Sequence, residues 1–172
     1  ASGVLTFFAT SVAAGIASWS QRTGKEIGPG DVEAATWAIA ELGRSFTAPQ
    51  FFLAREQVLV HSRRIAEWWT GGFDLLLTPT LPEPPPPLGH FRGLPENPLE
   101  GLLRGASFAM LCAPFNATGQ PAITLPLGRS SDGLPVGVQL VAAYGREDLL
   151  IRVASQLEQA TPWADRWPAV SP

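Results

Sequence analysis

"PAITLPLGRSSDGLPVGVQLVAAY", residues 121–144, decides the fold, because two runs of strand-forming residues flank a turn in this stretch. The runs predict strands over about 121–127 and 135–143, since β-branched and other bulky apolar side chains suit a pleated sheet. The segment "RSSDG" between them holds the serine, aspartate and glycine that are typical of turns. The two segments are therefore expected to form a hairpin or neighbouring strands.

A third strand is predicted over 74–80, where "DLLLTPT" is a short continuous apolar run between turn signals. This pattern is typical of a strand covered on both faces, so the strand is expected in the centre of the sheet. Pro79 cannot donate a hydrogen bond to a neighbouring strand, which leaves Thr80 at the carboxyl end of the run. Ligands bind at that end of open α/β sheets, so Thr80 is a candidate ligand-binding residue.

Helical patterns surround these strands and predict an α/β fold in which helices cover the sheet. Thr47 and Gln50 have the spacing of a capping box, and Asp31 is placed to cap an earlier helix. Pro114 is expected to close the helix before it. The predicted helices cover about 3–22, 31–43, 47–70, 98–112 and 147–160.

Composition limits the class of protein. The chain has 172 residues, 45% of them hydrophobic, which suffices for one domain with a buried core. Its net charge of -3 leaves no cationic surplus for a phosphate backbone, so no nucleic-acid partner is expected. Cys112 is the single cysteine, which precludes an internal disulfide and favours a reducing compartment, the cytoplasm.

The first twenty residues carry no charge, so a membrane span or a signal peptide has to be weighed. No cationic segment precedes the apolar run, as a signal peptide would require. Val4, Phe8, Val12 and Ile16 recur at helical spacing, while threonine, serine and glutamine gather on another side. This two-faced pattern favours a helix packed on protein, and no membrane partner is expected.

The residues alone show no complete catalytic set. The GxSxG pattern of serine hydrolases is absent, and "GASFA" at 105–109 falls inside a predicted helix. His61 and His90 lack the spacing of a metal site, so no metal and no cofactor are predicted. His61 is expected to be a core or interface residue, and Cys112 a buried structural thiol.

Several motifs together resemble the carboxyl-terminal part of the amidase signature family. They are "DLLLTPTLPEPPP", the FNxTGxPAxxxP segment within "PFNATGQPAITLPLG", the GLPxGxQ strand and the closing helix with Glu158. They occur in the order and spacing of the family, and residues 74–163 carry the strong matches. The resemblance implies that residues 1–172 are the carboxyl-terminal portion of a single amidase domain, with part of a mixed central sheet covered by helices.

Members of this family hydrolyse amides with a serine nucleophile, a second serine on a cis peptide bond and a lysine base. These residues belong to the amino-terminal half of the family's fold, near a glycine- and serine-rich signature. No such run occurs here, and Lys25, the single lysine, lies in a glycine-rich connection that does not match the catalytic context. The resemblance therefore predicts a fragment of an amide hydrolase that contains no catalytic residue, is inactive alone and needs the amino-terminal half as its partner.

The candidate substrate-binding residues are Thr80, Phe115, Asn116 and Thr118. Phe115 and Asn116 are expected to line a pocket for a small-molecule amide whose nucleophile comes from the amino-terminal half. Gly119 can adopt backbone angles that other residues resist, which suits a turn after them. The alternative is that Asn116 and Thr118 only satisfy backbone groups in this turn.

Two other functions stay open at this point. One is a subunit of an amidotransferase that feeds ammonia to glutamyl-tRNA, and the other is a non-catalytic binding or interaction module. Apolar faces left exposed by an absent half would favour self-association, so a homo-oligomer is also open.

Overall fold

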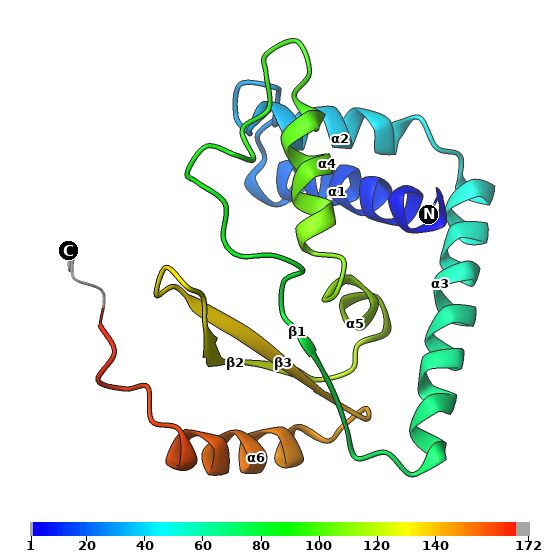
Figure 1. The fold of residues 1–172 in the computed structure, drawn as a ribbon. Helices are drawn as coiled ribbons and strands as arrows, with labels where there is room; N and C mark the ends of the chain where they lie inside the picture. Colours follow the sequence, from blue (N-terminus) through cyan, green and yellow to red (C-terminus); the bar gives the residue numbers. More distant parts are fainter. Residues whose placement is uncertain (1, 168–172) are drawn as a thin grey trace. The chain divides into compact units, whose positions relative to one another are not determined.

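The computed structural model describes residues 2–167 and divides the chain into two compact units. The first, here called the helical unit, comprises Ala1–Arg63 and Pro86–Ser107. The second, here called the sheet unit, comprises Arg64–Pro85 and Phe108–Pro172. Each is described by itself, with the elements labelled as in Figure 1.

The helical unit is built on α1 (Ser2–Thr23), α2 (Ala34–Arg44), most of α3 (Ala48–Trp68) and α4 (Leu99–Phe108). Helix α1 packs on α2 through small residues: a Cβ at Gly43 would fall 2.0 Å from the carbonyl oxygen of Ala9. This close approach buries a small apolar cluster that excludes water from between the helices. Its buried members are Ala13, Ile16 and Ala40, with Val12, Ile27 and Trp37 packed against them.

The ends of these helices test the capping predictions. The Thr47–Gln50 capping box is confirmed, because the Thr47 N–H donates to Gln50 Oε1 at 2.8 Å and the Gln50 N–H donates to Thr47 Oγ1 at 3.4 Å. The prediction for Asp31 is wrong, since α2 begins at Ala34 with Glu33 at its N-cap. Asp31 instead accepts hydrogen bonds from the Gly28 N–H and from Lys25, which closes the loop before α2.

Helix α1 is long and apolar enough, by length and composition, to cross a membrane, with a hydropathy of 1.3 over its Gly3–Thr23 segment. Within the helical unit its Ala13 and Ile16 are buried, and other apolar side chains on it are exposed. A helix that is apolar on several sides is one that further protein or lipid covers.

The sheet unit contains a three-stranded antiparallel sheet in the order β1-β3-β2. The strands are β1 (Leu75–Pro79), β2 (Ala122–Arg129) and β3 (Pro135–Ala142), and the other elements are η1 (Trp69–Gly71), α5 (Ala113–Thr118) and α6 (Glu147–Ala160). The expected pairing of β2 with β3 is confirmed, with the Gly133 N–H donating to the Ser130 carbonyl at 3.0 Å in the turn between them.

The two faces of this sheet differ because side chains alternate along each strand. One face packs on α6 and forms the apolar core of the unit, in which Leu125, Leu140, Ala142 and Leu150 are buried (Figure 1). The opposite face carries polar side chains in one row across the sheet, where Gln139 of β3 pairs with Thr78 of β1 and with Thr124 of β2. The sheet therefore has a packing face and a polar face.

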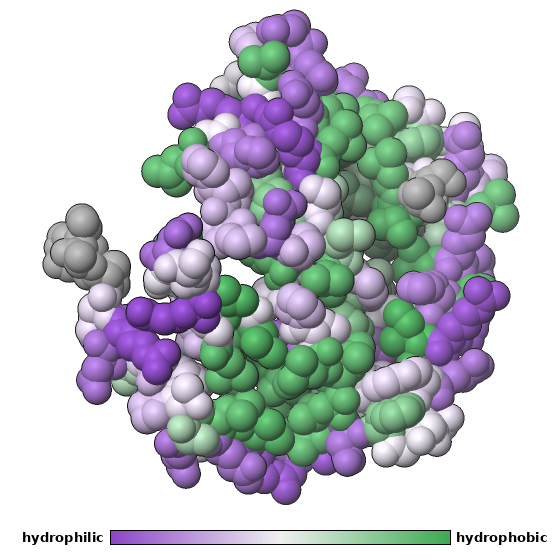
Figure 2. Space-filling view, in the orientation of Figure 1, coloured by the Kyte–Doolittle hydropathy of each residue, from purple (hydrophilic) through white to green (hydrophobic). Residues whose placement is uncertain are grey.

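Strand β1 does not lie where its sequence predicts. Among the described residues it is an edge strand, and the central position belongs to β3, which pairs with both other strands. Leu77, inside the apolar run, is 65% exposed. Figure 2 shows apolar side chains gathered on the surface over the sheet unit. A largely apolar strand at an open edge is a surface that further chain can cover.

A short helix, α5, replaces the turn that was predicted around residues 114–119. The predicted helix over 98–112 ends at Phe108, and Pro114 opens the first turn of α5 instead of closing the preceding helix. Proline is tolerated there because the first N–H groups of a helix have no partner within it. Gly119 ends α5 with φ 78°, its N–H donating to the Phe115 carbonyl at 2.8 Å.

Candidate functional site

The candidate site lies on the polar face of the sheet unit, centred on Gln139. The Gln139 side chain is almost fully buried, at 4% exposed. Its Nε2 donates one hydrogen bond to Thr78 Oγ1 at 3.0 Å and another to the Leu111 carbonyl at 3.2 Å. Both N–H donors of the amide are thus used, and they join β3 to β1 and to the segment that precedes α5.

Thr80 follows β1 directly, at the strand end where the sequence predicts a ligand-binding residue. Its N–H donates to the Gly137 carbonyl at 3.0 Å, and its hydroxyl donates to Thr124 Oγ1 at 3.2 Å. Its carbonyl accepts a hydrogen bond from the Cys112 thiol at 3.3 Å. The half-buried Thr80 is therefore held by three separate partners within the sheet unit.

Gly137 leaves the space that this arrangement needs. A Cβ at position 137 would lie 2.8 Å from Thr80 Oγ1 and 3.0 Å from Thr124 Cγ2. These distances are shorter than van der Waals contact, so any larger residue at 137 would displace one of the two threonines. Glycine at this position allows the hydroxyl pair to form.

The other predicted site residues lie on α5. Phe115 is buried at 9% exposed, whereas Asn116, the next residue, is exposed. The Thr118 hydroxyl donates to Oε1 of Gln120, itself buried at 8% exposed. Thr118 therefore bonds a neighbouring side chain, not a backbone group as the turn interpretation held.

The structure joins these candidates through Cys112, the N-cap residue of α5. Its thiol bonds the Thr80 carbonyl, so the end of β1 and the start of α5 are adjacent. The prediction that Cys112 is buried is wrong, because the residue is half-buried, and its thiol contact with Thr80 joins two segments of the sheet unit. The candidate site thus consists of the end of β1, the polar row on β3 and β2, and the helix α5.

Sequence reasoning missed Gln139, Gly137 and Thr124 as members of this site. A signal was present in the GLPxGxQ motif, which places Gly137 and Gln139 two residues apart and so on one face of a strand. The identity of their partners was hidden, because Thr78 and Leu111 lie 61 and 28 residues away from Gln139 in the chain.

Lys25 has a local structural role in the helical unit. Its Nζ lies 2.9 Å from Asp31 Oδ1, and its side chain is 71% exposed. Hydrogen bonds from the Gly28 N–H and from Lys25 hold the pKa of the Asp31 carboxyl below its usual value. The ion pair stabilises the loop before α2.

Other sequence candidates are also placed by the structure. His61 is exposed on α3, so the core alternative is wrong, and the interface alternative stays a prediction. Ser107, inside "GASFA", donates to the Arg104 carbonyl at 2.6 Å within α4, which confirms its helical interpretation. Within residues 2–167 no three His, Cys, Asp or Glu side chains group as metal ligands would.

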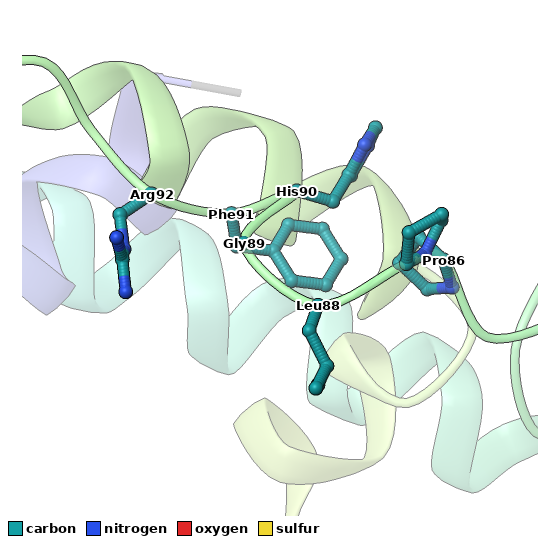
Figure 3. Close-up of a pocket in the computed structure, with 7 residues that line it drawn as sticks. Pro86, Leu88, Gly89, His90, Phe91 and Arg92 are labelled. Carbon is teal, nitrogen blue, oxygen red and sulfur yellow. The ribbon is translucent and has the colours of Figure 1, made fainter.

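The proline-rich loop of the helical unit borders an open surface hollow of about 590 Å³. Its lining is one run of consecutive residues, Pro86–Arg92, in which the His90 N–H donates to Pro87 and the Arg92 N–H donates to Gly89. Figure 3 shows Leu88 and His90 pointing to opposite sides of this loop. The hollow contains none of the predicted site residues and is a consequence of the loop's turns.

Comparison with known proteins relates this chain to a family. The family model described as Amidase matches residues 5–151. The chain is 40% identical over 169 residues to a 6-aminohexanoate-cyclic-dimer hydrolase of Pseudomonas sp. (strain NK87), covering 95% of this chain and 34% of that protein. It is 41% identical over 162 residues to the protein of the same name from Paenarthrobacter ureafaciens, covering 89% of this chain and 33% of that protein.

A solved structure gives the same result for the fold. The structure of 6-aminohexanoate cyclic dimer hydrolase complexed with substrate matches with a TM-score of 0.84 and 36% identity, over 96% of this chain and 36% of that one. This chain therefore spans about a third of the length of the curated relatives that it matches.

Proposed function

This chain belongs to the amidase (amidase signature) family, and from that membership we propose that it is the carboxyl-terminal portion of an amide hydrolase. The complete protein cleaves the C–N bond of an amide: water supplies a hydroxyl group to the carbonyl carbon, and the nitrogen leaves with a proton as ammonia or an amine. The family match over residues 5–151 is the observation that carries this proposal.

The amino-terminal portion of the same amidase domain supplies the catalytic serines and lysine. This assignment is supported by the chemistry of the present chain, whose single lysine is paired with Asp31 in a surface loop. The acyl-serine route that the family resemblance implies splits hydrolysis into two steps, acylation of the nucleophile and attack by water. The present chain then acts as scaffold and pocket wall and is inactive alone.

The substrate is a small-molecule amide, with cyclic amides as the first class to test. Two relatives more than a third identical to this chain are named for hydrolysis of the cyclic dimer of 6-aminohexanoate. A pocket wall for such a ring needs apolar surface together with a few polar groups. Phe115, Asn116, Thr118 and Thr80 supply these on one side of the pocket.

The roles of these four residues differ because their surroundings differ. Asn116 is exposed and carries both a donor and an acceptor, so it is the one placed to contact the substrate amide. Phe115 is buried, and its side chain anchors α5 in the sheet unit. Thr80 and Thr118 already bond within the sheet unit, so they shape the wall and leave direct recognition to Asn116.

The amino-terminal portion covers the open edge of β1. The apolar run of β1 is typical of a strand covered on both faces, yet Leu77 is 65% exposed in this structure. The curated relatives are about three times as long as this chain, which leaves ample polypeptide to pair with that edge. The partner of this chain is thus the remainder of its own domain, and the parent protein works in the cytoplasm without nucleic acid or membrane.

The test uses the complete parent protein and the cyclic dimer of 6-aminohexanoate. Chromatography should show conversion of the cyclic dimer to the linear dimer, while the present chain alone shows none. No hydrolysis across a panel of cyclic and linear amides would contradict the proposed activity. Turnover by these 172 residues alone would contradict the assignment of catalysis to the remainder. Ammonia release from glutamine only in the presence of partner subunits would favour an amidotransferase.

A further inference from the structure

One buried amide ties three segments of the sheet unit together. Gln139 belongs to β3, the central strand, where its neighbour two residues on, Val141, is fully buried. From this fixed strand its Nε2 reaches Thr78 on β1 and the Leu111 carbonyl ahead of α5. A buried carboxamide that uses both donors has little freedom to rotate, because turning it would leave a buried polar group without a partner.

A second contact joins the same segments beside the first. The thiol of Cys112 bonds the Thr80 carbonyl at 3.3 Å. Gln139 links Leu111 to Thr78 by bonding both, and the adjacent residue Cys112 bonds the Thr80 carbonyl directly. Two adjacent hydrogen bonds restrain both the position and the orientation of residues 111–112. A thiol is a weak donor, so the Gln139 amide makes the stronger of the two.

Helix α5 depends on this attachment for its position. It has six residues, and helices of this length are not stable by themselves. Its first hydrogen bonds run from the Phe115 and Asn116 N–H groups to the Cys112 carbonyl, both at 3.1 Å. The place of residues 111–112 therefore sets where the helix starts and where Asn116 faces.

We propose that Gln139 is the positioning residue of the substrate pocket: its carboxamide holds α5, and with it Asn116 and Phe115, against the end of β1. This inference rests on the proposed function, in which α5 forms one wall of the amide pocket. Gly137 completes the arrangement by leaving room for the Thr80 and Thr124 hydroxyls. Gly137 and Gln139 are two residues apart, so both lie on the polar face of β3, where one leaves room and the other bonds.

The experiment replaces Gln139 by leucine in the complete parent protein. Gln139→Leu removes both donors and keeps the volume of the side chain. A displacement of about 1 Å in a substrate-positioning group costs up to roughly 100-fold in rate, so kcat/KM for the cyclic dimer should fall by about 10- to 100-fold. We expect most of this loss in KM, because the chemical groups are contributed by the remainder of the protein.

Amide hydrogen exchange gives a readout that is independent of activity. The amides of α5 should exchange faster in Gln139→Leu than in the wild type, while those of α6 on the opposite face keep their protection. The matched control is Leu140→Val, at the adjacent buried position of β3, which faces α6. It should lower the melting temperature without raising KM or speeding exchange in α5.

A second variant keeps the proposal testable if Gln139→Leu fails to fold. Thr78→Val removes one acceptor of the Gln139 amide with almost no change in shape. It should raise KM several-fold, and combining it with Gln139→Leu should cost less than the sum of the two, since both remove the same hydrogen bond.

The outcomes separate this inference from the proposed function. If the wild-type protein hydrolyses amides while both variants keep wild-type KM and α5 exchange, the positioning role is overturned. Equal KM losses in Gln139→Leu and Leu140→Val would overturn it as well, because they would show a general loss of stability. If the wild type hydrolyses no amide, the proposed function fails, and faster exchange confined to α5 still supports the attachment.

Discussion

Gly137 lies directly against Thr80, because a Cβ at position 137 would stand 2.8 Å from the Thr80 hydroxyl oxygen. Gly137→Ala in the complete protein should therefore lower the free energy of unfolding by about 1–3 kcal/mol, the usual cost of overpacking. Chemical denaturation measures this change in the free energy of unfolding. Adding Thr80→Ala should recover part of the loss, and two losses that simply add would contradict the steric explanation.

The close packing of α1 on α2 predicts that a larger residue at Gly43 also destabilises the helical unit. A Cβ at Gly43 would lie 2.0 Å from the backbone carbonyl oxygen of Ala9, and backbone atoms yield less easily than side chains. Gly43→Ala should lower the melting temperature more than Gly137→Ala does. The control is Gly15→Ala in α1, where nothing lies within 4 Å of an added Cβ. Alanine should there stabilise the helix by about 0.5–1 kcal/mol.

The Asp31 carboxylate predicts a pH dependence of stability. Its pKa is lowered from 3.8 by the hydrogen bond from Gly28 and by Lys25, so the folded state binds its proton more weakly than the unfolded state does. The stabilisation is thus fully present above this value and is lost as the pH falls through the lower pKa of the folded state. Asp31→Asn should melt at a lower temperature than the wild type near neutral pH, and the difference should close in acid.

The control for this pH effect is Asp132→Asn. Asp132 lies in the exposed turn between β2 and β3, where its Oδ1 accepts a long hydrogen bond from the Ser131 hydroxyl at 3.5 Å. Thermal melting across the pH range should show little change for this variant. A gap between Asp31→Asn and the wild type that persists at low pH would argue against the ion-pair explanation.

Cys112 offers a test of the weaker contact between α5 and β1. Cys112→Ser keeps a donor for the Thr80 carbonyl, whereas Cys112→Ala removes it. The alanine variant should lose up to about 1 kcal/mol of stability relative to serine, the range for a single neutral hydrogen bond. Equal unfolding free energies for the two variants would show that the thiol contributes packing alone.

A charge placed at Leu77 tests whether the remainder of the domain covers β1. In the complete protein, Leu77→Glu should sharply reduce soluble yield and melting temperature, because it places a charge where the remainder of the domain covers the strand. In the present chain alone it should change little, since Leu77 is 65% exposed. The control is Gln156→Glu, which adds the same charge at an exposed position of α6. It should leave the yield and the melting temperature unchanged in the complete protein and in the present chain.

Local patterns predicted most of the secondary structure. The capping box at Thr47, the turn between β2 and β3 and the acidic first turn of α6 are all encoded within a few residues. Helix α5 was missed because six residues are too few to show a helical period, and Pro114 suits a helix start as well as a helix end. Strand β1 was misplaced because its neighbours in a sheet are set by distant segments.

The sequence named Thr80 and residues 115–118 as site candidates, which stay a prediction, and it did not single out Gln139. Thr80 and the 115–118 segment carry motifs that can be read locally, and the structure brings the two together through Cys112. Gln139 could not be assigned a partner, because its hydrogen bonds cross 61 and 28 residues of chain. Its burial and its place in the middle strand emerge only when all three strands are paired.

The two faces of the sheet differ in what a substitution on each of them would change. Substitutions beneath α6 alter the apolar packing and put folding at risk. Substitutions along α5 act on a short helix held by a few polar contacts, so under the proposed function they would alter the pocket wall while the packing beneath α6 is kept. The packing that holds the sheet together would then be separate from the surface that selects the substrate.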